Sequence, residues 1–108
     1  VEFTNIFNLP EAAKTPRKIM IRADLIIHNC GQLVTCAANG KVKKGREMQE
    51  LSIIKNGALA IQNGKICAVG TTSEILNKYE CDYPKFVIDA QGKVVMPAFV
   101  DPHTHIIY

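Results

Sequence analysis

Apolar and polar positions alternate with a two-residue period along most of the chain from Ala23 onward, which predicts short strands. The segments "ADLIIHNC" (23–30) and "QLVTC" (32–36) read as two such strands. In "GALAIQNGKICAVG" (57–70), two alternating runs flank Asn63-Gly64, and both turn residues tolerate the positive φ of a tight turn. We therefore predict a β-hairpin centred on this pair.

One segment has a helical pattern instead. In "TTSEILNKYE" (71–80), Thr71 followed by Glu74 is typical of a capping box, and Ile75, Leu76 and Tyr79 share one helical face. After it, "KFVIDAQGKVVMP" (85–97) predicts a strand, a Gln91-Gly92 turn and a further strand.

The pattern predicts a mainly β fold with one short helix over residues 20–97. Between the second and third strands we expect a polar loop, "AANGKVKKGREMQE" (37–50). Residues 1–19 show neither a helical nor a strand period, so we interpret them as a disordered N-terminal extension, with Met20 as a candidate start. A chain of 108 residues has room for one domain, because a single domain commonly takes about 100–150 residues.

The charge of the chain gives no indication of a nucleic-acid partner. The formal net charge is only +3, and a basic group in the 37–50 loop has no interleaved aromatic residues and is followed by Glu47 and Glu50. A solvated loop fits this pattern better than a phosphate-binding patch. That group consists of Lys41, Lys43, Lys44 and Arg46.

The cysteine spacing and the length of the apolar runs favour a reduced, cytoplasmic protein. Four cysteines match neither a Cys-x-x-Cys knuckle nor a redox pair, and no signal-like apolar region precedes them, so we expect free thiols. No apolar run approaches the roughly 18 residues of a membrane span, so we expect no membrane partner. The cysteines are Cys30, Cys36, Cys67 and Cys81.

The segment "FVDPHTH" (99–105) combines metal-ligand residue types with suitable spacing. If 99–107 is a strand, His103 and His105 lie on one face, roughly 6.6 Å apart along the backbone. Two imidazoles can then converge on one ion, whereas chance or a tag remnant would explain an isolated His-x-His equally well. Asp101 on the same face is a candidate partner that orients an imidazole, or an ordinary surface carboxylate.

Two histidines do not complete a hydrolytic zinc site, which usually has three protein ligands and water. His28 lies on a predicted strand and is expected to be a packed or solvent-facing histidine, and Tyr108 has no visible partner. Either the His-x-His motif is idle or its remaining ligands belong to chain that is not in this sequence.

The run from Met96 to His105, "MPAFVDPHTH", resembles the start of the first barrel strand in the amidohydrolase superfamily, and the preceding hairpins resemble its small β domain. Within the superfamily, "NCGQLVTC", "GREMQELSIIKNGALAI" and "VDPHTHIIY" are similar to the N-terminal portion of the imidazolonepropionase family. The resemblance covers residues 21–108.

This resemblance implies a small β-sandwich-like composite domain (20–97) leading into the first strand (98–108) of a (β/α)₈ TIM-type barrel that needs about 250 residues and is otherwise absent. It implies His103 and His105 as ligands of one zinc or iron ion. It also implies hydrolysis of 4-imidazolone-5-propanoate to N-formimidoyl-L-glutamate in histidine degradation, and a homodimer. No catalytic residue is assigned in this sequence and the substrate-binding residues are unknown, so we expect the 108-residue chain alone to be inactive.

One residue departs from the family pattern, because Ala98 replaces the usual glycine. A positive φ there would strain the backbone by about 1 kcal/mol, whereas a need for a small side chain alone would leave alanine harmless. Two other readings stay open: another amidohydrolase, such as a hydantoinase, a dihydroorotase-like enzyme or an aminohydrolase deaminase, and a non-catalytic β module.

Overall fold

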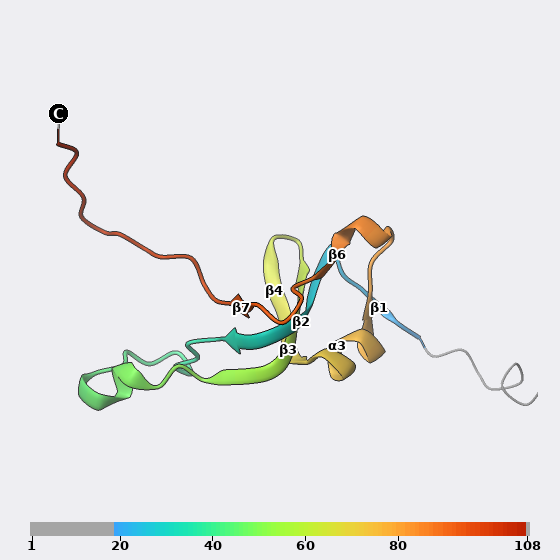
Figure 1. The fold of residues 1–108 in the computed structure, drawn as a ribbon, viewed down its shortest axis with the longest axis horizontal. Helices are drawn as coiled ribbons and strands as arrows, with labels where there is room; N and C mark the ends of the chain where they lie inside the picture. Colours follow the sequence, from blue (N-terminus) through green and yellow to red (C-terminus); the bar gives the residue numbers. More distant parts are fainter. Residues whose placement is uncertain (1–18, 108) are drawn as a thin grey trace, which may run out of the picture.

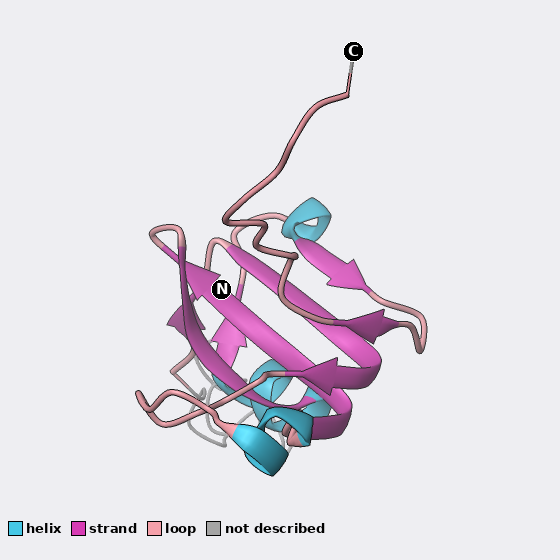
Figure 2. Ribbon diagram, turned by 90° about the vertical axis from the view of Figure 1, so that its left-hand side faces the viewer, coloured by secondary structure: helices cyan, strands magenta, loops and turns pink. Residues whose placement is uncertain are grey.

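The computed structural model describes residues 19–107, and the prediction for residues 1–18 lies outside this range. The fold is mainly β with one short α-helix, as the sequence predicts (Figure 1). Figure 2 shows the longer strands side by side, with the C-terminal segment running away from them. The elements are β1 (Ile21–Arg22), β2 (Leu25–Val34), η1 (Gly45–Gln49), β3 (Ile53–Gln62), β4 (Lys65–Thr71), α3 (Thr72–Lys78), β5 (Tyr79–Glu80), η2 (Pro84–Phe86), β6 (Val87–Asp89) and β7 (Val94–Val95).

The predicted hairpin and the predicted helix are both confirmed. Strands β3 and β4 pair antiparallel across Asn63 and Gly64, whose φ angles are +52° and +73°. Helix α3 follows directly, and its cap is the expected box: Thr71 Oγ1 accepts from Glu74 N, and Glu74 Oε2 accepts from Thr71 N. Of the apolar face, Ile75 is buried while Leu76 is 38% exposed.

The two strands predicted over 23–36 are one strand, β2, so that boundary is wrong. Strand β2 contains a β-bulge close to the break that the sequence predicted between two strands. The pairing register of β2 with β3 shifts between Ile27 and Cys30, and Asn29 has a φ of +55°. The Asn29 N–H donates to Thr72 Oγ1 at 2.9 Å, which satisfies a backbone donor that the ladder leaves free.

Strands β6 and β7 do not pair with each other. Both lie parallel to β2 along the same edge, β6 beside Ile26–His28 and β7 beside Gln32–Leu33. The turn between them, at Gln91 (φ +53°) and Gly92 (φ +77°), fits against the β2 bulge, where Gly31 has no room for a side chain. A Cβ on Gly31 would lie 2.1 Å from the Gly92 carbonyl oxygen.

The five-stranded sheet has two unlike faces. On one, Ile75 of α3 covers a small-residue cluster with Ile26, Ala58 and Ala60. On the other, Leu59 packs with three buried neighbours, but Ile66 and Val69 of β4 are 64% and 48% exposed. An apolar groove of about 320 Å³ on that face is lined by Leu33, Val34, Thr35, Leu59, Ile66, Val69, Val95, Met96 and Pro97. Within residues 19–107, the predicted sandwich-like second layer is therefore incomplete.

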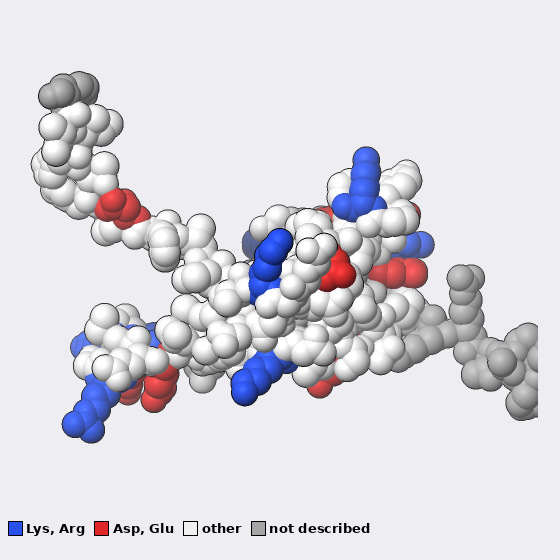
Figure 3. Space-filling view, in the orientation of Figure 1, with Lys and Arg blue, Asp and Glu red and all other residues white. Residues whose placement is uncertain are grey.

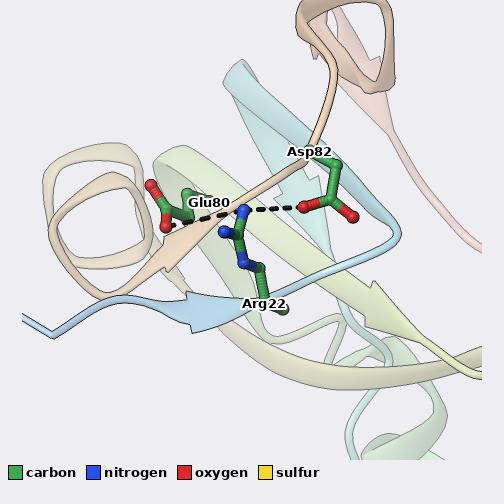
Figure 4. A network of polar contacts seen from close by, with 3 residues as sticks. All are labelled: Arg22, Glu80 and Asp82. Atoms are coloured by element: carbon green, nitrogen blue, oxygen red, sulfur yellow. Dashed lines mark ion pairs between the residues drawn. The ribbon is translucent and has the colours of Figure 1, made fainter.

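Strands β1 and β5 form a separate two-stranded parallel sheet beside α3 (Figure 1). Arg22 lies between two carboxylates there, with Nη1 3.6 Å from Glu80 Oε1 and 2.7 Å from Asp82 Oδ1 (Figure 4). All three side chains are about half exposed or more, so these ion pairs contribute little, on the order of 0–1 kcal/mol each.

The polar loop over 37–50 contains a short 3₁₀ helix, η1, that the pattern did not predict. Figure 3 shows basic and acidic side chains side by side at this end of the molecule, which fits a solvated loop. All four cysteines are free thiols, as predicted, and burial raises the pKa of the Cys30 thiol. Among the described residues, no helix is long and apolar enough to span a bilayer.

Candidate metal centre

The His-x-His motif lies in a segment that leaves the sheet. After β7 the chain runs away from the β domain to its C-terminal end (Figure 1), and residues 97–107 form no strand. The strand predicted over 99–107 is therefore not formed within the described part of the chain. A strand needs a partner for its backbone groups, and no described segment pairs with this one.

Ala98 carries no backbone strain. It is not among the residues with positive φ, so the replacement of the family glycine leaves an ordinary L-residue conformation. The backbone strain that a positive φ would impose on alanine therefore does not arise at position 98.

The backbone ahead of the histidines is shaped by one side chain. Pro102 restricts Asp101 to extended conformations, and Asp101 Oδ1 accepts a hydrogen bond from the His103 N–H at 3.1 Å. The other carboxylate oxygen, Oδ2, accepts a short hydrogen bond from Thr104 Oγ1. These two bonds, from Thr104 first and His103 second, lower the pKa of the Asp101 carboxyl although it is solvent-exposed.

Asp101 contacts the motif through its backbone and through Thr104. Two roles were left open for it, a partner that orients an imidazole and an ordinary surface carboxylate. It bonds a backbone amide and a hydroxyl, and neither contact involves a histidine ring. This contact of Thr104 was not predicted from the sequence. The Asp-Pro-x-Thr spacing carried the signal, since Asp side chains often accept from backbone groups two residues on.

The imidazoles of His103 and His105 lie close together, although the strand from which their common face was predicted is not formed. Their Nε2 atoms are 2.6 Å apart, and the ring centroids are 4.6 Å apart at an angle of 54°. Two nitrogens bound to one tetrahedral ion at 2.0–2.1 Å lie about 3.3 Å apart, so a small opening of the pair admits a metal. Neutral imidazole suits zinc and iron, and the two side chains thus fit half of a ligand shell.

Further ligands are not supplied by the described residues. Between residues 19 and 107, no group of three or more histidine, cysteine or acidic side chains could hold a metal ion. His28 lies in β2, where its Nδ1 is buried without a hydrogen-bond partner, and its carbonyl accepts from the Ala90 N–H. It is a packed sheet residue, as predicted, and belongs to a different part of the molecule from the His-x-His pair.

Comparison with known proteins agrees with the sequence resemblance. Residues 86–108 match the family model described as "Amidohydrolase family". Imidazolonepropionases from Chloroflexus aggregans, Symbiobacterium thermophilum and Staphylococcus aureus are 42%, 45% and 41% identical to the chain over 85 residues.

Each match covers 79% of this chain and 19–20% of the relative, so the chain spans about a fifth of the length of the curated relatives it matches. The predicted resemblance is confirmed: the chain is similar to the N-terminal portion of imidazolonepropionase, and its residues 86–108 match the amidohydrolase family model.

Proposed function

We propose that this chain is the N-terminal part of a metal-dependent hydrolase of the imidazolonepropionase type. The reaction is hydrolysis of 4-imidazolone-5-propanoate to N-formimidoyl-L-glutamate, a step of histidine degradation. The convergence of the His103 and His105 rings, at 2.6 Å between Nε2 atoms, is the observation that carries the proposal. Similarity of 40–45% to relatives named imidazolonepropionase supports the choice of substrate.

The roles of this chain's own residues follow from their chemistry. His103 and His105 would each supply one ring nitrogen to a single zinc or iron ion, and amidohydrolases are generally metal-dependent. When bound, the metal supplies a Lewis acid that polarises the amide carbonyl and acidifies water near neutral pH. Asp101 holds the backbone between the two ligands through the His103 amide and the Thr104 hydroxyl.

We propose that residues 98–108 become the first strand of a (β/α)₈ barrel when the neighbouring strands are present. The exposed apolar side chains of this segment support that proposal, since Phe99, Val100 and Ile107 are 93%, 89% and 94% exposed here. Barrel enzymes hold their sites at the carboxyl ends of the strands, where the remaining ligands and the substrate-binding residues would lie. A homodimer of the whole enzyme is part of the same proposal.

The proposal is tested with the complete gene product and with the 108-residue chain in parallel. We expect the complete protein to open the imidazolone ring in a metal-dependent reaction and the 108-residue chain to show no turnover. Within the complete protein, His103→Ala should abolish activity, whereas His28→Ala should retain it in the folded fraction.

Two results would overturn the proposal. Turnover of hydantoins or of nucleobases in place of the imidazolone would assign the chain to another amidohydrolase. A coding sequence that ends at Tyr108, together with zinc affinity no higher than that of the double variant His103→Ala/His105→Ala, would identify a non-catalytic β module.

A further inference from the structure

The backbone around His103 and His105 is held by hydrogen bonds to a residue that is not one of the two candidate metal ligands. Between residues 98 and 107, the described hydrogen bonds outside the two rings are the pair that Asp101 accepts from the His103 amide and the Thr104 hydroxyl. No ladder fixes this segment, because residues 97–107 form no strand. The convergence of the rings therefore depends on local contacts.

We propose that Asp101 and Thr104 form a carboxylate–hydroxyl clip that pre-sets the backbone between the two histidines, so that both rings face one point before a metal binds. This inference rests on the proposed function, and it assigns positioning roles to two residues that are not ligands. We call the contacts of Asp101 with the His103 amide and the Thr104 hydroxyl the Asp101 clip.

The geometry supports the clip in three steps. Pro102 fixes its own φ near −65° and keeps Asp101 extended, so the Asp101 side chain is directed towards the following residues. Oδ1 then takes the His103 N–H at 3.1 Å, and Oδ2 takes the hydroxyl of Thr104. With both carboxylate oxygens bonded to the residues that follow, the backbone between His103 and His105 is held, and the two ring centroids lie 4.6 Å apart.

Pre-setting matters because ordering a flexible segment at the moment of binding lowers affinity. The motif is fully exposed, and a segment without the clip would sample many orientations of the two rings. Partners that orient metal ligands typically change metal affinity by about 10- to 100-fold when removed. For this exposed site we expect a loss near the lower end of that range.

The test uses the 108-residue chain, with Zn²⁺ as the probe and the ring proton signals of His103 and His105 in NMR spectra as the readout. Following these rings separates the motif from the exposed thiols of Cys36 and Cys67, because thiolates are also a zinc-ligand type. We expect Thr104→Val and Asp101→Ala each to weaken zinc binding at the two rings by about tenfold. Thr104→Ser keeps the hydroxyl and should restore the affinity.

Thr35→Val is the matched control. The Thr35 hydroxyl donates to the Ser52 carbonyl oxygen at 2.9 Å, so this variant loses a comparable hydrogen bond within the β domain. Its zinc affinity should equal that of the unchanged chain. A tenfold loss in Thr35→Val as well would attribute the effect to general destabilisation and overturn the clip.

A metal-free readout separates failure of the clip from failure of the proposed function. Hydrogen exchange of the His103 amide should be slower in the unchanged chain than in Asp101→Ala, because the acceptor is removed. Equal exchange, or unaltered zinc affinity in Thr104→Val, overturns the clip and leaves the proposed function intact. Slowed exchange together with no zinc binding at either ring supports the clip and overturns the metal centre.

Discussion

The β domain and the C-terminal segment are built from similar apolar residues but differ in what those residues contact. In the domain, Ile26 and Ala58 are 1% and 0% exposed, whereas Phe99 and Ile107 of the segment are 93% and 94% exposed. The difference lies in the partners: β2 has strands on both sides, and residues 97–107 have none among the described residues. An apolar sequence alone therefore does not determine burial.

The same comparison separates two kinds of order. The β domain is held by long-range pairing of strands distant in sequence, while the ring pair depends on contacts within five residues. Stability and metal binding should therefore respond to different substitutions. Four predictions follow from this separation, beginning with the change of largest effect.

Removing one histidine should abolish chelation without affecting the fold. In His105→Ala, zinc is held by one ring instead of two, and losing the second attachment weakens binding by about 10²- to 10⁴-fold. The free energy of unfolding should change by less than about 0.5 kcal/mol, because the side chain lies on the exposed segment. Zinc titration and urea unfolding measure the two quantities. A shifted urea midpoint would mean that the segment packs on the domain.

Removing a core side chain should lower the free energy of unfolding. Ile26 is among the largest fully buried side chains, so Ile26→Ala should lower the free energy of unfolding by about 2–5 kcal/mol. Ile107→Ala deletes the same atoms at a site that is 94% exposed and serves as the control. Equal urea midpoints for the two variants would contradict the assignment of the core.

A single methyl group at the β2 bulge should also destabilise the domain. In Gly31→Ala, the new Cβ would meet the Gly92 carbonyl oxygen at 2.1 Å, and backbone has to move to relieve the overlap. We expect a cost of about 1–3 kcal/mol in thermal or urea unfolding. In the comparison variant, Gly70→Ala, the new Cβ clashes only with the end of the Glu74 side chain, so the cost is limited to the hydrogen bond of that carboxylate with the Thr71 amide. If the comparison variant is the less stable of the two, the contact between β2 and the 91–92 turn is wrong.

The smallest effect is a dependence on acid. Hydrogen bonds from the Gln91 amide and then the Asn29 side chain lower the pKa of Asp89. Because the folded pKa lies below the unfolded value of about 3.9, the stabilisation is present above that pH and is lost as the pH falls through the folded pKa. Asp89→Asn should therefore lower stability at neutral pH and flatten its loss below about pH 4. The measurement is the urea midpoint of the unchanged chain and of Asp89→Asn at several pH values. If Asp89 were not hydrogen-bonded, the two plots of midpoint against pH would be parallel.

Local signals predicted the elements that local chemistry determines. The Asn63-Gly64 turn and the Thr71 capping box appear where the sequence places them, because each depends on residues within a few positions. The proximity of the His103 and His105 rings is also local, since the residues are two positions apart, but the strand from which their common face was predicted is not formed.

Long-range features were not predictable in the same way. The sequence did not distinguish one bulged strand over 25–34 from two strands, because the bulge at Asn29 depends on Thr72 and on the 91–92 turn. The strand expected over 99–107 failed for a related reason, since its pairing partners are not among the described residues.

The sequence by itself determined the hairpin and the capped helix, which follow from neighbours along the chain. Only the tertiary structure decided that β6 and β7 share one edge of β2 and that one sheet face is covered by α3. The physical reason is that strand pairing and burial depend on groups that are distant in sequence.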